Sequence, residues 1–362
     1  SIHRRPFRLL PNRVWRTYQG GAFLDRIEGR PAPRDGNQPE DWIGSAVMAS
    51  NPARPGPAIP GEGLSIAEAC DGRRLPMTAV LADDPEAALG AAHVAAFGVK
   101  PQLLVKFIDS AVRLSIQAHP SVAWAKARLG AASGKTEAWW ILETRRPDAW
   151  VLAGFQRPPA ADAWRRMIAE QDTDAMMDCF DPVPVAPGDI LLIGGGLPHA
   201  IGPGITLLEI QEPTDFVVQC EYADKTLKVS ESARTMGLGA ERVVDMFDFT
   251  AYTPAEVKAR FGADPAVIAE SEGGREEALL AAPRTDLLEV RRLTVTGTFA
   301  PAFDGRYSVF VVLAGEGTLT VEGDAVPLKP WSRLFLPAAI DKASLEGRMA
   351  LARCLPPKPP GT

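Results

Sequence analysis

Proline and glycine divide this chain into many short runs, and that division constrains its fold more than any other feature. The 362 residues include 33 prolines and 32 glycines, spread along the whole sequence instead of gathered in one linker. Proline fixes φ and lacks an N–H donor, and glycine tolerates positive φ, so both are typical of turns. Frequent turns between short apolar runs predict a protein built mainly from β-strands.

The predicted strands are short runs rich in apolar residues. They lie at residues 103–109, 114–119, 137–143, 189–195 and 205–211, with a dense series over 285–356. Alanine-rich residues 64–97 are predicted to be helical, as are residues 160–179. Helices inserted among the strands of a β core predict a mainly β, α+β protein of the jelly-roll class.

The same pattern predicts two domains. The first, residues 1–235, contains the candidate functional residues and a helical insertion at about residues 60–98. The second, residues 236–362, is predicted to be a C-terminal β-barrel, and it contains no histidine. A chain of this length is long enough for more than one hydrophobic core.

Charge and cysteine content narrow the expected partners. The formal net charge is -6, which argues against nucleic acid or an anionic membrane surface as the main partner. No apolar run has the length needed to span a bilayer. The four cysteines are scattered and form no CxxC pair, which argues against a disulfide framework. We therefore expect a cytoplasmic protein with no nucleic-acid or membrane partner. The sequence predicts no oligomeric state.

Polar side chains follow one face of the predicted strand at residues 114–119. Side chains alternate between the two faces of a strand, so the apolar residues fall on one face. The other face carries Ser115, Gln117 and His119. A buried polar row costs free energy unless each group has a partner, so further polar groups must lie opposite this one.

Three further stretches supply such groups. Lys135 and Glu137 share a face of the next predicted strand, His199 stands at a strand border, and Glu209 and Gln211 share a face further on. Two imidazoles, a carboxylate and an amide oxygen form a plausible site for a divalent metal ion, and zinc, manganese, iron, cobalt and nickel all suit such donors. The alternative is that each histidine is an ordinary structural residue with a local partner. The residues alone leave both readings open.

Three segments, taken in order, resemble the type I phosphomannose isomerases. They are VKFIDSAVRLSIQAHP (105–120), GKTEAWW (134–140) and PGDILLIGGGLPHAIGPGITLLEIQEPTD (187–215). The resemblance is strong over about residues 100–225, weaker in the N-terminal segments VWRTYQGGAFLDR and PEDWIGSAV, and only general in the C-terminal barrel. Members of that family are metal-dependent cupins that interconvert mannose 6-phosphate and fructose 6-phosphate.

The resemblance implies a fold, a cofactor and a substrate class. The fold is a pair of cupin (jelly-roll) β-barrels, and the substrate is a sugar phosphate or a closely related sugar. The metal ligands implied are Gln117, His119, Glu137 and His199, and we expect them to bind one divalent metal ion, with zinc as the first expectation.

The resemblance also implies residues that act on the substrate. The active-site lysine of the family corresponds to Lys135, and the acidic residue of its Glu-x-Gln motif corresponds to Glu209. Its serine and lysine near the substrate phosphate correspond to Ser115 and Lys225. Lys135 and Glu209 are therefore the candidate catalytic residues.

One position departs from the family pattern. The family has an arginine after the Thr/Ser-Asp pair, and here TDFVVQCEYADK places Gln219 at that position. A neutral amide cannot replace the charge of a guanidinium. We therefore expect a changed preference for the phosphorylated sugar, and an isomerase of an unphosphorylated hexose is one alternative. A metal-dependent cupin dioxygenase and a non-catalytic sugar-binding cupin are the two others.

Overall fold

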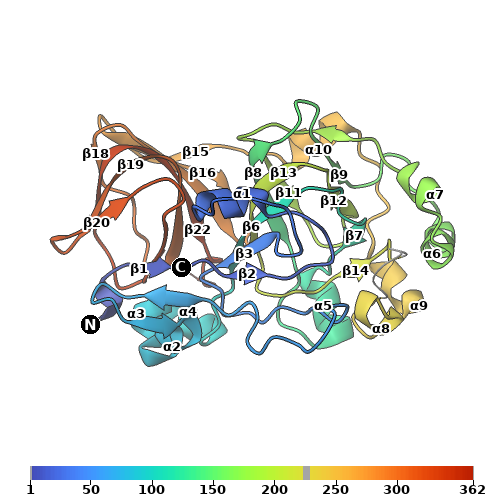
Figure 1. The fold of residues 1–362 in the computed structure, drawn as a ribbon, viewed down its shortest axis with the longest axis horizontal. Helices are drawn as coiled ribbons and strands as arrows, with labels where there is room; N and C mark the ends of the chain where they lie inside the picture. The colour runs from blue at the N-terminus through green and yellow to red at the C-terminus, as the bar shows by residue number, and fades with distance from the viewer. Residues whose placement is uncertain (1, 223–228, 362) are drawn as a thin grey trace.

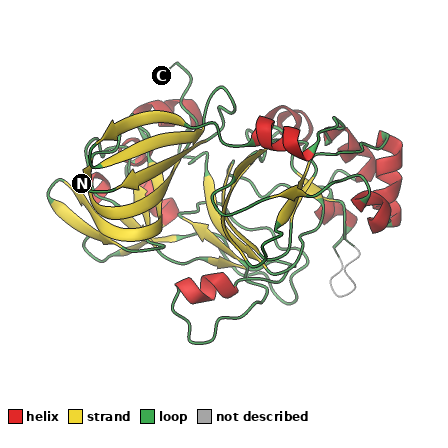
Figure 2. Cartoon of the chain, turned by 90° about the horizontal axis from the view of Figure 1, so that it is seen from above, coloured by secondary structure: helices red, strands yellow, loops and turns green. Residues whose placement is uncertain are grey.

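The computed structural model describes residues 2–222 and 229–361, and its strands form two bodies that lie side by side. In Figure 1 the C-terminal strands, orange to red, form the left body, and the green and cyan strands form most of the right body. In Figure 2 the strands fill the middle of each body, while helices lie at the periphery. The predicted mainly β, α+β fold class is confirmed.

The right body contains two sheets. A six-stranded sheet has the order β11-β8-β13-β6-β3-β2, and a five-stranded sheet has the order β10-β9-β12-β7-β14. The strands of the first are β2 (Arg13–Val14), β3 (Glu40–Ile43), β6 (Leu104–Ser110), β8 (Glu137–Thr144), β11 (Ile190–Ile193) and β13 (Ile205–Gln211). Those of the second are β7 (Gln117–Ala118), β9 (Trp150–Ala153), β10 (Val183–Pro184), β12 (His199–Ile201) and β14 (Val218–Gln219).

An apolar core joins these two sheets. Trp139 of β8 and Leu207 of β13 pack in one cluster with Val151 of β9 and Ile201 of β12, and all four side chains are buried. Each strand turns one face to this core, because side chains alternate along a strand. On β7 the polar face lies opposite Ile116 and Ala118. On β13, Glu209 and Gln211 share the face of Leu207, so the polar row continues from this core between the two sheets.

The left body is an eleven-stranded sheet with the order β15-β16-β17-β22-β19-β21-β1-β4-β5, to which β18 and β20 are attached. Its C-terminal strands are β15 (Ala266–Ser271), β16 (Gly274–Leu280), β17 (Glu289–Val295), β18 (Thr298–Phe299), β19 (Ser308–Val321), β20 (Asp324–Leu328), β21 (Arg333–Leu336) and β22 (Ser344–Leu355). Three strands come from the N-terminal part of the chain: β1 (Phe7–Leu9), β4 (Ile66–Glu68) and β5 (Arg74–Pro76). The proposed domain boundary after residue 235 stays a prediction. Of these three strands, β1 pairs with β21, which lies after that boundary, while β4 pairs with β1 and β5.

The helices are short. They are α1 (Ala22–Ile27), α2 (Met77–Asp83), α3 (Pro85–Leu89), α4 (Ala91–Phe97), α5 (Val122–Leu129), α6 (Ala161–Glu170), α7 (Thr173–Met177), α8 (Glu231–Arg234), α9 (Ala240–Val243) and α10 (Pro254–Phe261), with 3-10 turns η1 (Ile2–Arg4) and η2 (Val244–Met246). The prediction of helix over 64–97 is wrong for residues 64–76, because β4 and β5 pair as a hairpin that extends the sheet beyond β1. None of the helices in the described ranges is both long and apolar enough to cross a membrane.

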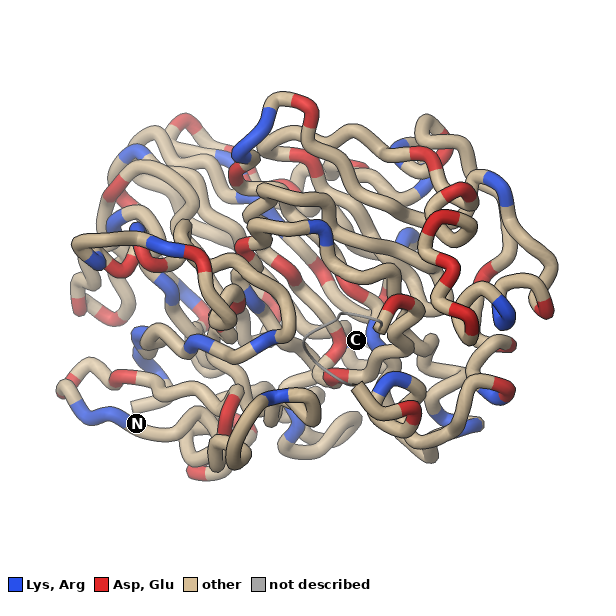
Figure 3. Tube along the Cα trace, turned by 45° about the vertical axis from the view of Figure 1, so that its right-hand side comes forward, with Lys and Arg blue, Asp and Glu red and all other residues tan. Residues whose placement is uncertain are grey.

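A buried ion pair links the two bodies. Arg333 of β21 pairs with Asp41 of β3, and both side chains are almost entirely shielded from solvent. Asp41 also accepts a hydrogen bond of 2.8 Å from the backbone N–H of Asn12. Lysine and arginine are otherwise intermingled with aspartate and glutamate along the chain (Figure 3). The Arg333–Asp41 pair differs from the exposed ion pairs of this protein, because water cannot reach either charge if its partner is removed.

We predict that Arg333→Met destabilises the protein by about 3–5 kcal/mol, since it leaves the Asp41 carboxylate buried without its partner. The measurement is the free energy of unfolding from urea titration. The control is Arg146→Met, which removes an exposed pair with Asp148 and should leave the free energy of unfolding nearly unchanged. Equal losses in the two variants would contradict the linking role of Arg333.

Candidate active site

The register of the five-stranded sheet places three predicted site residues in one row. Gln117 of β7 lies opposite His199 of β12 on one side and opposite Gln219 of β14 on the other. Leu114, Ile116 and Ala118 point into the apolar cores. The polar face contains Ser115, Gln117 and His119, and all three line one cavity. The predicted alternation around β7 is therefore confirmed, although the strand itself is only two residues long.

The six-stranded sheet supplies the opposing groups. Glu209 of β13 lies between Lys106 of β6 and Trp139 of β8 in the strand register. Glu137 is the first residue of β8, and Lys135 lies two residues before it. The polar rows of the two sheets thus meet, as the sequence pattern requires.

Two imidazoles and one carboxylate converge where the rows meet. Nε2 of His119 lies 3.3 Å from one Glu137 carboxylate oxygen, and Nε2 of His199 lies 3.4 Å from the other. One ligand atom from each residue lies within 4.8 Å of the others, so the three can hold one metal ion. The amide nitrogen of Gln117 is 3.5 Å from Nε2 of His199, which brings a fourth candidate ligand to the cluster.

Backbone carbonyls orient both imidazole rings. Nδ1 of His119 donates to the carbonyl of Phe216 at 2.8 Å, and Nδ1 of His199 donates to the carbonyl of Leu197 at 2.8 Å. A carbonyl only accepts, so Nδ1 carries the proton and Nε2 keeps its lone pair toward Glu137. Metal-binding histidines are held in this way by a hydrogen bond from the other ring nitrogen. The residues therefore fit a metal ion.

Burial keeps the two imidazoles neutral. Burial and the nearby Lys135 ammonium lower the pKa of His119 to about 3, and burial lowers the pKa of His199. Neutral imidazole is the form that binds a metal ion. Near neutral pH, protons therefore compete little with a metal ion for these two ring nitrogens.

Lys135 places a positive charge against the cluster. Its Nζ lies 2.9 Å from Nε2 of His119 and 3.1 Å from a Glu137 oxygen. Burial alone would raise the pKa of Glu137, but the Lys135 ammonium outweighs it and holds that pKa well below the ordinary value. Burial would lower the pKa of Lys135, yet Glu137 and Glu209 raise it. The two carboxylates thus keep the Lys135 side chain positively charged.

Glu209 lies in a second buried charge group. Its carboxylate is 3.0 Å from Nζ of Lys106, which is also 3.9 Å from Glu40. Burial and the Glu137 charge raise the pKa of Glu209, and Lys106 opposes that rise only in part. Burial would raise the pKa of Glu40, but Arg16 and Lys106 lower it to about 2. A raised pKa makes Glu209 a stronger base than an exposed glutamate.

One cavity of about 480 Å³ opens on both charge groups. Small-molecule sites typically have volumes of about 300–1,000 Å³. The predicted site residues that line this cavity are Ser115, Gln117, His119, Lys135, Glu209 and Gln219. Glu137 and His199 are buried behind this lining, against His119. Lys225 lies outside the described residues.

Sequence reasoning missed several charged residues of this cavity. Lys106 and Glu40 line it, as do Arg16 and Asp215, which form an ion pair. Lys106 had a visible signal, because a lysine in the middle of the apolar run LLVKFID needs a buried partner. Arg16 and Asp215 lie outside the strands and follow no periodic pattern.

Several known proteins are similar to this chain in sequence. A family model described as the cupin domain of mannose-6-phosphate isomerase matches residues 282–356. A mannose-6-phosphate isomerase from Streptococcus mutans is 28% identical over 249 residues, which cover 69% of this chain and 72% of that protein. A probable mannose-6-phosphate isomerase from Bacillus subtilis, GmuF, is 25% identical and covers 68% and 72%.

Solved structures share the whole fold. The mannose 6-phosphate isomerase of Bacillus subtilis superimposes with a TM-score of 0.72 at 19% identity, covering 96% of this chain and 99% of that one. A variant of phosphomannose isomerase from Salmonella typhimurium gives 0.71 at 15% identity, with 98% and 100% covered. The fold and the His–Glu–His cluster define a metal-binding type of cupin. Within the cupins, the chain is similar in sequence and fold to the mannose-6-phosphate isomerases.

We predict that His199→Ala lowers the affinity for zinc by roughly 100-fold or more, because a lost ligand should cost at least as much as a lost partner of a ligand. The measurement is elemental analysis of protein purified without chelator, followed by zinc titration of the metal-free protein. His93→Ala is the control, since Nε2 of His93 bonds the carbonyl of Lys100 at 2.7 Å and lies outside the cluster. Full metal occupancy in both His119→Ala and His199→Ala would refute the site.

Proposed function

We propose that this protein is a metal-dependent aldose–ketose isomerase that interconverts mannose 6-phosphate and fructose 6-phosphate. The observation that carries the proposal is one cavity in which His119 and Lys135, from the metal-binding cluster, face the base candidate Glu209. The names of the sequence relatives from Streptococcus mutans and Bacillus subtilis support the same reaction.

The metal ion proposed is zinc, held by His119, Glu137, His199 and the amide oxygen of Gln117. Imidazole nitrogens and a carboxylate suit zinc, although an amide oxygen is an unusual zinc ligand. A divalent ion there would polarise the oxygens on C1 and C2 of the sugar. All four cysteines are free thiols. That supports a reducing compartment, and we propose the cytoplasm.

Glu209 is the proposed base. Isomerisation breaks the C2–H bond of the aldose, forms the C1=C2 bond of a cis-enediol, and leaves the former carbonyl oxygen to take up a proton. The ketose then forms when C1 receives a proton, the hydroxyl on C2 gives up its proton, and C2 becomes the carbonyl carbon. Burial raises the pKa of Glu209, which brings its basicity closer to what general-base catalysis near neutral pH requires.

Lys135 is the proposed electrostatic partner of that step. Its ammonium lies beside His119 and Glu137, and it lines the same cavity as Glu209. The carboxylates around it raise its pKa, so it remains protonated and can donate a hydrogen bond to an oxygen that gains negative charge. Ser115 and Lys225 are proposed to contact the substrate phosphate.

We predict that Lys135→Met and Glu209→Gln each lower turnover of mannose 6-phosphate by roughly 100-fold or more, because each removes one partner of the proton transfer. Glu143→Gln is the control, since Glu143 is a half-exposed carboxylate that lies outside the cavity. The measurements are fructose 6-phosphate formation and zinc content. Unchanged turnover in Glu209→Gln at full zinc content would remove Glu209 from this role.

Gln219 bears on the choice between phosphorylated and free sugar. Among the described cavity-lining residues, each basic side chain is already paired: Arg16 with Asp215, Lys106 with Glu209 and Lys135 with Glu137. Gln219 lines the cavity and adds only dipoles. A phosphate dianion therefore meets less unpaired positive charge than an arginine at this position would supply.

We predict that Gln219→Arg raises the ratio of kcat/KM on mannose 6-phosphate to kcat/KM on mannose by roughly 10- to 100-fold, the value of one added charged hydrogen bond. Gln219→Met, which removes the amide without adding charge, should leave that ratio nearly unchanged. If the parent already prefers mannose 6-phosphate by several decades and Gln219→Arg has no effect, the substitution is neutral.

A further inference from the structure

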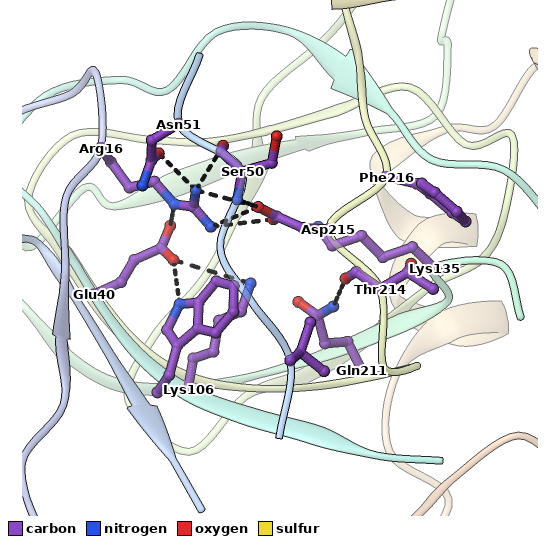
Figure 4. Close-up of polar contacts among 12 residues, drawn as sticks. Arg16, Glu40, Ser50, Asn51, Lys106, Lys135, Gln211, Thr214, Asp215 and Phe216 are labelled. Carbon is purple, nitrogen blue, oxygen red and sulfur yellow. Dashed lines mark hydrogen bonds and ion pairs between the residues drawn. The ribbon is translucent and has the colours of Figure 1, made fainter. Parts of the chain in front are cut away.

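Arg16 connects three segments at the wall of the cavity (Figure 4). Its guanidinium contacts both carboxylate oxygens of Asp215 at 3.1–3.3 Å. It also donates to the Asn51 side-chain oxygen at 3.0 Å, and its Nε lies 3.0 Å from Glu40. Only 12% of the Arg16 side chain is exposed. The contacts therefore join the segment after β2, the segment after β3 and the segment after β13.

Asp215 is held from a second direction as well. The backbone N–H of Ser50 donates to its carboxylate at 2.9 Å. The neighbouring Thr214 hydroxyl donates to the carbonyl of Gly134 at 2.6 Å, and the Gln211 amide donates to the carbonyl of Thr214 at 2.7 Å. Residues 214–216 are thus fixed by side chains from several elements.

The next residue gives this segment its chemical importance. Phe216 follows Asp215 directly, and its carbonyl accepts the hydrogen bond from Nδ1 of His119 at 2.8 Å. That bond determines which nitrogen of His119 carries the proton and where Nε2 points. The position of the Phe216 carbonyl depends in turn on how its segment is held.

We propose that Arg16 is a positioning residue of the metal centre, which acts through Asp215 to hold the Phe216 carbonyl against His119. We name this pair the Arg16–Asp215 clamp. Its role rests on the proposed metal centre, but it concerns an arginine that neither touches the cluster nor follows from the family resemblance. Arginine suits the task because its planar fork engages both oxygens of a carboxylate at once and stays charged.

Removal of the clamp has a defined consequence. Without Arg16, the Asp215 carboxylate keeps only the Ser50 N–H among the partners described above. The segment then has more freedom, and the His119 ring loses part of the constraint on its tautomer and orientation. A metal ion would meet a ligand that must first be ordered, which weakens binding.

The test uses full-length protein and two measurements. The first is the ratio of the two His119 tautomers in the metal-free protein, from ¹⁵N NMR of the ring nitrogens. The second is the affinity for zinc ion. We expect Arg16→Met to populate the Nε2-protonated tautomer and to weaken zinc binding about tenfold, at the low end of the effect of changing a direct partner of a ligand.

Two further variants make the result specific. Asp215→Asn should weaken zinc binding by a similar factor, and the double variant should be no worse than either single variant, because both remove one interaction. Arg16→Lys keeps the charge but makes only a point contact, so its zinc affinity should lie between those of the parent and Arg16→Met. If Arg16→Met does not fold, the comparison rests on Arg16→Lys and Asp215→Asn.

Arg145→Met is the matched control. Arg145 is also a guanidinium held by two carboxylates, Asp35 and Asp109, and it does not line the cavity. It should leave the His119 tautomer and the zinc affinity as in the parent. The proposed role of the clamp is wrong if Arg16→Met and Asp215→Asn keep the parental tautomer ratio and zinc affinity. It is also wrong if Arg145→Met loses as much zinc affinity as Arg16→Met.

A separate isomerase assay distinguishes failure of the clamp from failure of the proposed function. Shifted tautomers with no isomerisation of any hexose phosphate would support the clamp and reject the function. Isomerisation with an unchanged His119 in Arg16→Met would support the function and reject the clamp.

Discussion

The contact of one buried carboxylate with two imidazoles and an ammonium sets the conditions for the rest of the site. Glu137 is almost fully shielded, and an isolated charge in that position would be very costly. Lys135 compensates it and the two neutral histidines pack against it, and each of these groups needs its own support. Backbone carbonyls orient the rings, and the Glu212 carboxylate accepts the N–H groups of Gly134 and Thr136 on either side of Lys135. The arrangement of both sheets can be understood as the scaffold that brings these supports together.

The polar rows could be predicted from the sequence because strands have a short period. Gln117 and His119 alternate with apolar neighbours, and Glu209 and Gln211 do the same, so each row defines a face. Pairing between neighbouring strands then places these polar faces side by side. The family motifs added roles for Lys135 and Ser115 that periodicity alone does not provide.

The parts that were not predicted depend on loops and distant contacts. Arg16 and Asp215 are separated by 199 positions, and neither lies in a strand or a helix. No local pattern indicates which charged loop residues will meet. The hairpin of β4 and β5 was missed for a related reason. Alanine-rich neighbours favour helix locally, but an open sheet edge beside β1 offers these residues hydrogen bonds that outweigh propensity.

The pairing of β1 with β21 also affects how the chain acquires its structure during synthesis. Phe7 lies opposite Phe335, so β1 finds this partner only after residue 335 has left the ribosome. Until then, the edge of β1 that pairs with β21 has no permanent neighbour, although its other edge can already pair with β4. Contacts between such distant residues slow folding, and unpaired strand edges favour association with other chains. Nascent chains of this protein therefore pass through a stage in which chaperones would find an accessible strand at the N-terminal end.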